Sequence, residues 1–406
     1  MKMKFLGATG TVTGSKYLLT SGDSQILVDC GLFQGYKQLR LRNWAPLPVP
    51  VSDVDAVVLT HAHLDHSGYL PLLVRDGFRG KIFCSAATFE LCKILLPDSG
   101  RLLEEEAIHA NRHGYSRHAP ALPLYSEADA LRALKYFAPV EFGKAFSIAG
   151  NLTGELALAG HILGAAIVRI GDGRTSLTFS GDLGRMHDAI MPEPAPVGQS
   201  DYLVLESTYG DRVHDPAAPA ILLGQTIRET ASRGGVTLIP SFAVGRAQSL
   251  MYAIDQLKLH GQIPHALPVY LNSPMAADVT ALYQKYRPLH RLDRQQCDAM
   301  CHAAKIVNSV EESIALNQRQ RPMVIIAASG MATGGRVLHH LKAFASDSRN
   351  TILFAGFQAG GTRGAAMLAG VDAIKIFGEY VPLRAHVKQI DNLSAHADAD
   401  EILYWL

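Results

Sequence analysis

The stretch Thr60-His61-Ala62-His63-Leu64-Asp65-His66-Ser67-Gly68 carries the strongest signal in this sequence. It follows residues 56–59, an apolar run that predicts a buried strand. Three imidazoles and one carboxylate lie within residues 61–66. Neutral imidazole and carboxylate are the usual protein ligands of zinc and similar divalent metals, so the stretch predicts a metal site at the end of a strand.

The spacing within this stretch indicates more than one metal ion. A strand directs His61 and His63 to the same face, because side chains alternate with a period of two. Asp65 and His66 are adjacent and must point in different directions. We therefore expect His61 and His63 to bind one ion, and Asp65 and His66 to bind another. The alternative is a polar surface loop that contains a few histidines, which this spacing directly after a strand disfavours.

The composition is that of a globular protein able to bury a large core, with 406 residues, 48% hydrophobic and 18% charged. The net charge is only +1, so any binding of nucleic acid must come from a local cluster of charge. The N-terminus does not resemble a signal peptide, and the longest apolar runs are strand-sized. Five scattered cysteines suit a reducing compartment, so we expect a cytoplasmic protein that does not bind membranes.

The same arrangement of an apolar strand followed by one ligand-type residue recurs along the first half of the chain. Asp29 follows residues 25–28, and His161 comes just after residues 156–159. Asp182 comes just after residues 176–179, and Glu206 follows residues 202–205. Sites are often built at strand ends, where side chains from several strands converge. We expect these residues to gather with the histidine cluster.

The second half of the chain has a different texture. From Tyr209 onward, apolar strand-like runs alternate with helical segments, as in residues 220–232, 236–239, 245–258 and 269–271. Strands at 324–327 and 352–355 continue the alternation. This pattern predicts a second α/β unit with a mostly parallel sheet.

The first half resembles the metallo-β-lactamase superfamily, through residues 61–66 together with His161 and Asp182. The resemblance implies an αββα sandwich with two zinc ions at one sheet edge. It implies that His61, His63 and His161 bind one zinc, that Asp65 and His66 bind the other, and that Asp182 bridges both. Asp29 matches the aspartate that orients metal ligands in this family.

The second half resembles the β-CASP group of RNA-processing nucleases. The matching segments are residues 205–212, 242–248, 273–276, 329–331 and 393–398. The resemblance implies that an α/β β-CASP domain is inserted into the sandwich. We assign residues 1–208 to the metallo-β-lactamase domain, 209–384 to the β-CASP domain, and 385–406 to the return into the first domain. A third family motif, a strand carrying a histidine ligand after His396, is not found within these residues.

The resemblance implies a zinc-dependent ribonuclease that hydrolyses single-stranded RNA by a two-metal mechanism and leaves a 5′-phosphate and a 3′-hydroxyl. Asp65 would orient the attacking water, and His396, held by Glu206, would act as general acid. The residues leave open whether cleavage is endonucleolytic, 5′-exonucleolytic or both. Two alternatives remain: a small-molecule metallo-hydrolase on the same fold, and a non-catalytic RNA-binding homologue. The candidate assembly is a homodimer.

The predicted RNA contacts are local. Arg246, Arg336 and Arg363 lie in or beside glycine-containing segments, and arginine suits phosphate because of its planar fork. Turns at strand ends carry Ser273 and Ser329, where backbone N–H groups can hold phosphate. Ser394, in the last β-CASP segment, completes this set of expected RNA-binding residues. The alternative for the arginines is a structural role in ion pairs.

Overall fold

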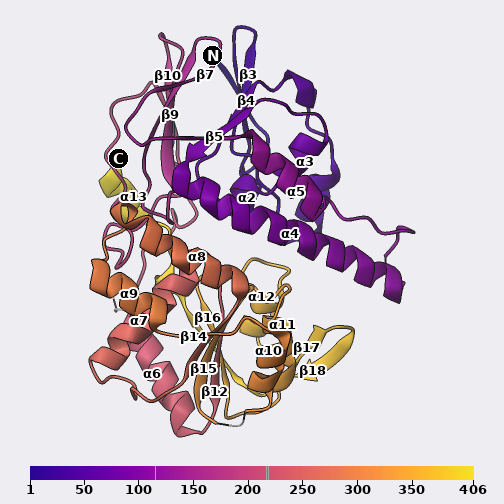
Figure 1. Ribbon diagram of the computed structural model, residues 1–406, viewed down its shortest axis with the longest axis vertical. Coiled ribbons are helices and arrows are strands. Elements are labelled where there is room, and N and C mark those ends of the chain that lie inside the picture. The colour runs from indigo at the N-terminus through magenta and orange to yellow at the C-terminus, as the bar shows by residue number, and fades with distance from the viewer. Residues whose placement is uncertain (115, 216, 218, 320) are drawn as a thin grey trace. The chain divides into compact units, whose positions relative to one another are not determined.

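The computed structural model describes residues 1–406 except residues 115, 216, 218 and 320, and it divides into two compact units (Figure 1). The first unit comprises Met1–Arg212 and His396–Leu406, and the second comprises Val213–Ala395. None of the helices in the described part of the chain is both long enough and apolar enough to cross a membrane.

The first unit contains two sheets. One has the order β1-β2-β3-β4-β5-β6, with bounds β1 (Lys2–Phe5), β2 (Tyr17–Ser21), β3 (Ser24–Val28), β4 (Ala56–Val58), β5 (Lys81–Ser85) and β6 (Phe137–Val140). The other has the order β11-β10-β9-β8-β7, with bounds β7 (Phe146–Ala149), β8 (Leu152–Leu158), β9 (Ala166–Gly171), β10 (Ser176–Phe179) and β11 (Tyr202–Val204). Buried residues of both sheets form one core cluster, so the sheets pack face to face as a sandwich.

Local sequence explains which strands lie inside. β8 alternates buried and exposed positions, as expected when one face meets the core and the other meets water. β4 is buried at all three positions and pairs in parallel with β3 and β5. The helices of the unit are α2 (Leu64–Ser67), α3 (Leu70–Arg75), α4 (Ala86–His113), α5 (Glu127–Ala133) and α13 (Ala399–Trp405), besides the short α1 (Lys37–Leu41). α4 packs on β5 and β6, and α5 packs on α3 and α4.

The second unit is built on a six-stranded sheet in which every strand pair is parallel. Its order is β14-β13-β15-β12-β16-β19, with bounds β12 (Val236–Pro240), β13 (Val269–Asn272), β14 (Lys305–Ile306), β15 (Met323–Ala327), β16 (Thr351–Ala355) and β19 (His386–Ile390). The central strands are buried at every position, which explains their unbroken apolar sequences. The predicted parallel α/β unit is therefore confirmed.

Helices alternate with these strands along the described residues of the second unit: α6 (Pro219–Ser232), which precedes β12, then α7 (Arg246–Leu259), α8 (Pro274–Lys285), α9 (Arg294–His302), α10 (Val310–Asn317), α11 (Val337–Phe344) and α12 (Arg363–Leu368). A separate hairpin consists of β17 (Ala373–Ile376) and β18 (Glu379–Pro382). In the structure β19 pairs with β16, so the chain re-enters the first unit at His396, later than the boundary at residue 385 assigned from sequence.

Candidate metal centre

The histidine stretch leaves its strand earlier than its apolar sequence suggests. β4 ends at Val58, and the backbone N–H of Thr60 donates to the Asp29 carboxylate at 2.8 Å instead of to a neighbouring strand. The expectation that strand alternation places His61 and His63 on one face is therefore wrong. Their rings still converge, with centroids 4.9 Å apart, because the chain turns here into the short helix α2.

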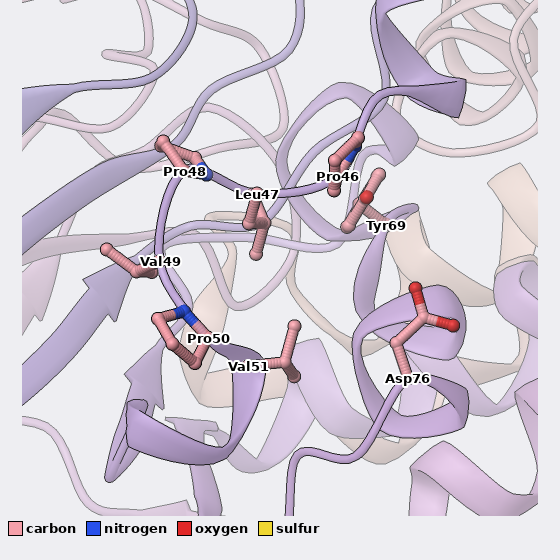
Figure 2. A pocket seen from close by; sticks show the side chains of 8 residues that line it. All are labelled: Pro46, Leu47, Pro48, Val49, Pro50, Val51, Tyr69 and Asp76. Carbon is pink, nitrogen blue, oxygen red and sulfur yellow. The ribbon is translucent and has the colours of Figure 1, made fainter.

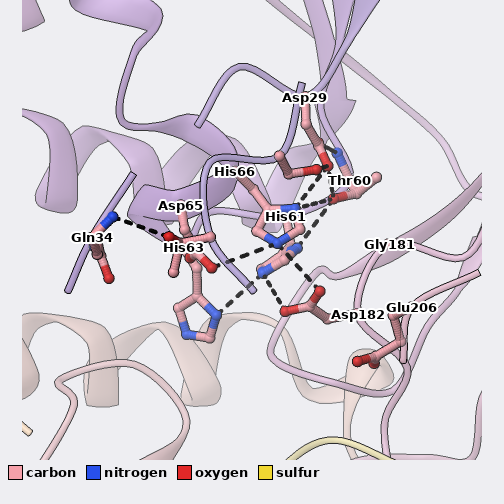
Figure 3. A network of polar contacts seen from close by, with 12 residues as sticks. Asp29, Gln34, Thr60, His61, His63, Asp65, His66, Gly181, Asp182 and Glu206 are labelled. Atoms are coloured by element: carbon pink, nitrogen blue, oxygen red, sulfur yellow. Dashed lines mark hydrogen bonds and ion pairs between the residues drawn. The ribbon is translucent and has the colours of Figure 1, made fainter. Parts of the chain in front are cut away.

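Three imidazoles and one carboxylate come together, with one ligand atom of each within 4.8 Å of the others: His61, His63, His161 and Asp182. Figure 3 shows His61, His63 and Asp182 beside one another. His61 Nε2 lies 3.1 Å from His63 Nδ1, which in turn lies 3.2 Å from His161 Nε2. Asp182 Oδ2 is 3.4 Å from His61 Nε2 and 3.5 Å from His161 Nε2. A tetrahedral ion with ligand bonds of 2.0–2.1 Å separates its ligand atoms by about 3.3 Å. The spacing and chemistry of these donors fit a zinc-type ion.

A second group of donors adjoins the first through Asp182. Its other oxygen, Oδ1, lies 3.2 Å from His66 Nε2, and Asp65 Oδ2 lies 3.9 Å from that nitrogen. The two oxygens of Asp182 therefore face different imidazoles, an arrangement that can join two cations. Gly181 permits this approach, because its φ is +56° and an added Cβ would lie 2.9 Å from the Thr60 side chain.

The Asp29 carboxylate organises the interior side of the site. It accepts hydrogen bonds from Thr60 N at 2.8 Å, Thr60 Oγ1 at 3.0 Å and Ser15 Oγ at 3.1 Å. His66 Nδ1 lies 2.7 Å from Asp29 Oδ2, so the ring presents Nε2 to Asp182. Asp29 has a positive φ of 57°, which aspartate tolerates better than most residues. Ser15 and Thr60 were not assigned from sequence, since only the folded chain brings them to Asp29.

His396 reaches the same cluster from the C-terminal segment. Its Nδ1 lies 3.0 Å from Glu206 Oε2 and 4.0 Å from Asp182 Oδ2. The backbone fixes this position, because Ala397 N donates to Leu183 O and Leu183 N donates to Glu206 Oε1. The structure thus brings Glu206 and His396 together with the predicted metal ligands.

Buried charges interact strongly across the cluster. Burial lowers the pKa of His61 well below its usual value, and the neighbouring His66 adds to the effect. Burial alone would also lower the pKa of His66, but Asp182 and Asp29 outweigh it and raise that pKa. For Asp182, burial opposes ionisation, yet His66 and His61 hold its pKa well below the usual range. For His396, burial is outweighed by Glu206 and Asp182, which raise the pKa to about 9.

The predicted RNA-binding arginines of the second unit make close contacts with their own chain. Arg336 donates to Asn272 Oδ1 at 2.7 Å, to Val307 O at 2.9 Å and to Asn308 O at 2.6 Å. Arg363 donates from Nε to Lys375 O at 2.7 Å, and from its NH1 group to two carbonyls of the residue 329–335 loop. These partners are backbone carbonyl oxygens and one amide oxygen, so the bonds are structural without being ion pairs. The RNA contacts of Arg336 and Arg363 stay predictions.

The other predicted RNA contacts occupy turns at strand ends. Ser273 Oγ caps α8 by accepting from Ala276 N at 3.1 Å, and Ser329 Oγ accepts from Thr333 N at 3.2 Å. Arg246 opens α7 beside Gly356, where an added Cβ would lie 3.4 Å from the guanidinium. Ser394 closes a short turn through its backbone N–H to Asp391 O. None of these contacts involves RNA, so the RNA-binding roles of these four residues stay predictions.

A cavity of about 440 Å³ lies elsewhere in the first unit (Figure 2). It is lined by the proline-rich segment 46–51 together with Tyr69 and Asp76. The lining includes none of the predicted metal ligands, so the cavity does not belong to the candidate metal centre.

Comparison with known proteins identifies the family. Residues 9–221 match the metallo-beta-lactamase superfamily, residues 247–367 match the Beta-Casp domain, and residues 380–406 match the Zn-dependent metallo-hydrolase RNA specificity domain. The chain belongs to the metallo-β-lactamase superfamily, in its β-CASP group. The resemblance inferred from sequence is confirmed, and the protein is a metal-dependent hydrolase.

Individual relatives cover the whole chain. The ribonuclease TTHA0252 of Thermus thermophilus is 40% identical over 100% of this chain and 90% of its own length. The transcription termination factors FttA of Methanosarcina mazei and Pyrococcus abyssi are both 31% identical, over 100% and 99% of this chain. The chain spans only 64% and 63% of those two factors. A crystal structure of a protein of unknown function from Enterococcus faecalis V583 has a TM-score of 0.52 at 14% identity, covers 99% of this chain and 91% of its own, and supports the fold alone.

Proposed function

We propose that this protein is a zinc-dependent ribonuclease that hydrolyses phosphodiester bonds of single-stranded RNA. The observation that carries the proposal is the convergence of His61, His63, His161 and Asp182 within 4.8 Å, at separations that suit a tetrahedral ion. Ribonuclease TTHA0252, which is 40% identical, supports RNA as the substrate.

In this proposal the site holds two zinc ions. His61, His63 and His161 would hold one ion, Asp65 and His66 would hold the other, and Asp182 would serve both. When bound, the ions supply an activated water and stabilise the negative charge that develops on the phosphate. The fixed contact between Asp29 and His66 supports this assignment, because ligating histidines usually donate their other ring nitrogen to a carboxylate.

Proton transfer falls to His396 and Glu206. Hydrolysis forms a bond between phosphorus and the water oxygen and breaks the bond to the 3′-oxygen, which must gain a proton. Glu206 holds Nδ1 of His396 at 3.0 Å, and this contact favours the protonated ring that a general acid requires. Asp65, beside the same cluster, would orient the attacking water. The products are a 5′-phosphate and a 3′-hydroxyl.

We expect a preference for single-stranded RNA because a duplex is stiffer than a single strand. A single strand can bend to present one phosphate to the donor cluster, whereas a duplex resists such deformation. A small-molecule hydrolase on this fold needs no second unit of the size of Val213–Ala395, and a non-catalytic homologue needs no intact ligand set. Both alternatives are therefore less consistent with the chain than a nuclease.

The test is a gel assay on matched single-stranded RNA, duplex RNA and single-stranded DNA, with and without a chelator. We expect single-stranded RNA to be cut, duplex RNA to resist, and the chelator to abolish cleavage until zinc is restored. End-labelled substrates report endonucleolytic and 5′-exonucleolytic products separately. Equal cutting of duplex and single strand would contradict the single-strand proposal, and hydrolysis of lactones or β-lactams without nuclease activity would contradict the ribonuclease.

Two further expectations accompany this proposal. The five cysteines, Cys30, Cys84, Cys92, Cys297 and Cys301, are all free thiols, as expected in the reducing cytoplasm that we propose as the location. The homodimer stays a prediction, which sedimentation velocity at micromolar concentration would test directly.

A further inference from the structure

The β17–β18 hairpin of the second unit ends in an unusual turn. Ile376 pairs with Glu379, so Phe377 and Gly378 form a two-residue loop. Both have positive φ, 49° for Phe377 and 88° for Gly378, as a type I′ turn requires. Asparagine, aspartate or glycine normally fills the first loop position, because a bulky side chain is strained there. A phenylalanine at this position therefore needs an explanation other than turn formation.

Packing within the hairpin does not supply that explanation. Ile374, Ile376 and Val381 point into the core cluster of the second unit and anchor the hairpin. Phe377, in contrast, is 45% exposed, and Tyr380 is 73% exposed. Figure 1 shows the two strands projecting beside α11, away from the six-stranded sheet. The hairpin thus presents two large aromatic rings to solvent.

One histidine and two lysines lie on or beside the hairpin. The imidazole of His339 lies against Phe377, with ring centroids 4.9 Å apart. The Nζ of Lys375 lies 5.9 Å from the Tyr380 ring centroid, and Lys375 makes no ion pair with any described residue. Lys342, 46% exposed, pairs with Glu379 at 2.6 Å and stands on the same helix as His339. The lysines are the cations of this surface, because burial and the neighbouring Lys342 lower the pKa of His339. Exposed aromatic rings beside lysines are typical of surfaces that bind single-stranded nucleic acid.

Arg363 holds this surface in place. Its Nε donates to the carbonyl of Lys375 in β17, and its NH1 group donates to Ala332 O and Thr333 O. One guanidinium therefore ties the hairpin to the residue 329–335 loop. Through these bonds Arg363 positions the hairpin, and its RNA contact stays a prediction.

We propose that Phe377 and Tyr380, flanked by His339, Lys342 and Lys375, form a stacking platform for bases of single-stranded RNA. The inference rests on the proposed ribonuclease function for its choice of RNA. A base can stack on either ring while a lysine meets the adjoining phosphate, so recognition is tolerant of sequence. The platform belongs to the second unit, whereas the candidate metal centre belongs to the first.

The decisive variant is Phe377→Asn, because asparagine suits the left-handed turn and removes the ring. We expect the affinity of the full chain for a 20-nucleotide single-stranded RNA, in an Asp182→Ala background that stops cleavage, to fall about fivefold or more. The melting temperature should stay the same or rise, because the turn strain is relieved. Tyr380→Thr, which keeps a β-forming residue, should weaken binding in the same way without disturbing the turn.

Tyr202→Thr is the matched control. Tyr202 is an exposed tyrosine, with 63% of its surface accessible, but it lies on β11 of the first unit. Its affinity for RNA should equal that of the parent. Unchanged affinity in both hairpin variants would overturn the proposal, as would a change in sedimentation coefficient that shows the hairpin to be a contact between copies. If the protein cuts single-stranded RNA while the hairpin variants bind normally, only the platform fails. If the variants lose RNA binding but the parent cuts no RNA, only the proposed catalysis fails.

Discussion

Substitution of Asp29 by asparagine tests the metal centre while preserving its shape. Asp29 Oδ1 accepts from Thr60 N, and an asparagine oxygen can keep that bond. Oδ2 takes the other three contacts, from Ser15 Oγ, Thr60 Oγ1 and His66 Nδ1. In the asparagine variant an NH₂ group, which is a donor, replaces Oδ2 and faces these three groups, which donate to Oδ2 in the parent. The two hydroxyls can rotate and accept, but the imidazole can accept only by moving its proton to Nε2.

That proton shift would disable the nitrogen of His66 that faces Asp182 Oδ1 at 3.2 Å. Loss of such a supporting contact typically reduces metal affinity about 10- to 100-fold, or about 1.4–2.7 kcal/mol. The fold should survive, since only one of four contacts changes from favourable to unfavourable. Asp29→Ala is a poorer test, because four buried donors without an acceptor would each cost about 1–3 kcal/mol.

The assay is zinc content by elemental analysis after dialysis against a graded competitor chelator. Asp29→Asn should lose the ion held by Asp65 and His66 at a lower chelator concentration than the parent, and retain the other. Asp55→Asn is the matched control, because Asp55 accepts from Gln25 N at the far end of the same sheet. Equal retention of both ions in Asp29→Asn, or equal loss in Asp55→Asn, would refute the role given to the Asp29–His66 contact.

Three further predictions test separate parts of the molecule. His396→Ala should abolish RNA cleavage and retain zinc, whereas Asp182→Ala should lose both; zinc loss in His396→Ala would contradict its role as general acid. Arg336→Lys should lower the free energy of unfolding in urea by about 2 kcal/mol, because lysine cannot replace the fork that binds Asn272 and two carbonyls; a fall of about 0.7 in the salt slope of RNA binding would instead make it a phosphate contact. Burial lowers the pKa of Lys16 to about 8, so the unfolded chain holds this proton more tightly, and stability should rise between pH 8 and pH 10.5. Relative to Lys16→Met, the parent should gain roughly 3 kcal/mol in free energy of unfolding between pH 7 and pH 11, measured by denaturant titration. The same pH dependence in both proteins would contradict the lowered pKa of Lys16.

The sequence predicts most of the donor cluster because strand ends are local features. Apolar runs ending in Asp29, His161, Asp182 or Glu206 can be recognised without knowing how the strands pair. The fold then brings these ends together, as the sandwich requires. The exact end of β4 could not be predicted from sequence, because the bond between Thr60 N and Asp29 joins segments far apart in sequence.

The arginines of the second unit show where sequence reasoning is weakest. A glycine-rich neighbourhood favours phosphate binding for both Arg336 and Arg363, but it does not reveal which oxygens of the chain come within reach after folding. The partners of Arg336 come from β13 and the segment after β14, and those of Arg363 come from a loop and a hairpin. Such partners depend on tertiary packing, which motif spacing does not encode. The hairpin rings were missed for the same reason, since exposure of Phe377 is a property of the folded unit.

Three histidines of the first unit share one contact, a protein oxygen beside Nδ1, although we assign them two different chemical roles. In His61, His66 and His396 alike, Nδ1 lies next to an oxygen of the protein, which fixes the ring and directs chemistry to Nε2. The partner differs: a hydroxyl holds His61, whereas carboxylates hold His66 and His396. A carboxylate also favours the charged ring, which suits a proton donor and conflicts with metal ligation unless a cation displaces the proton. His66 is one of the residues that would hold such a cation, and its Nε2 faces an Asp182 oxygen at 3.2 Å. His396 contacts Glu206 more closely than Asp182, so this ring can keep its proton for transfer.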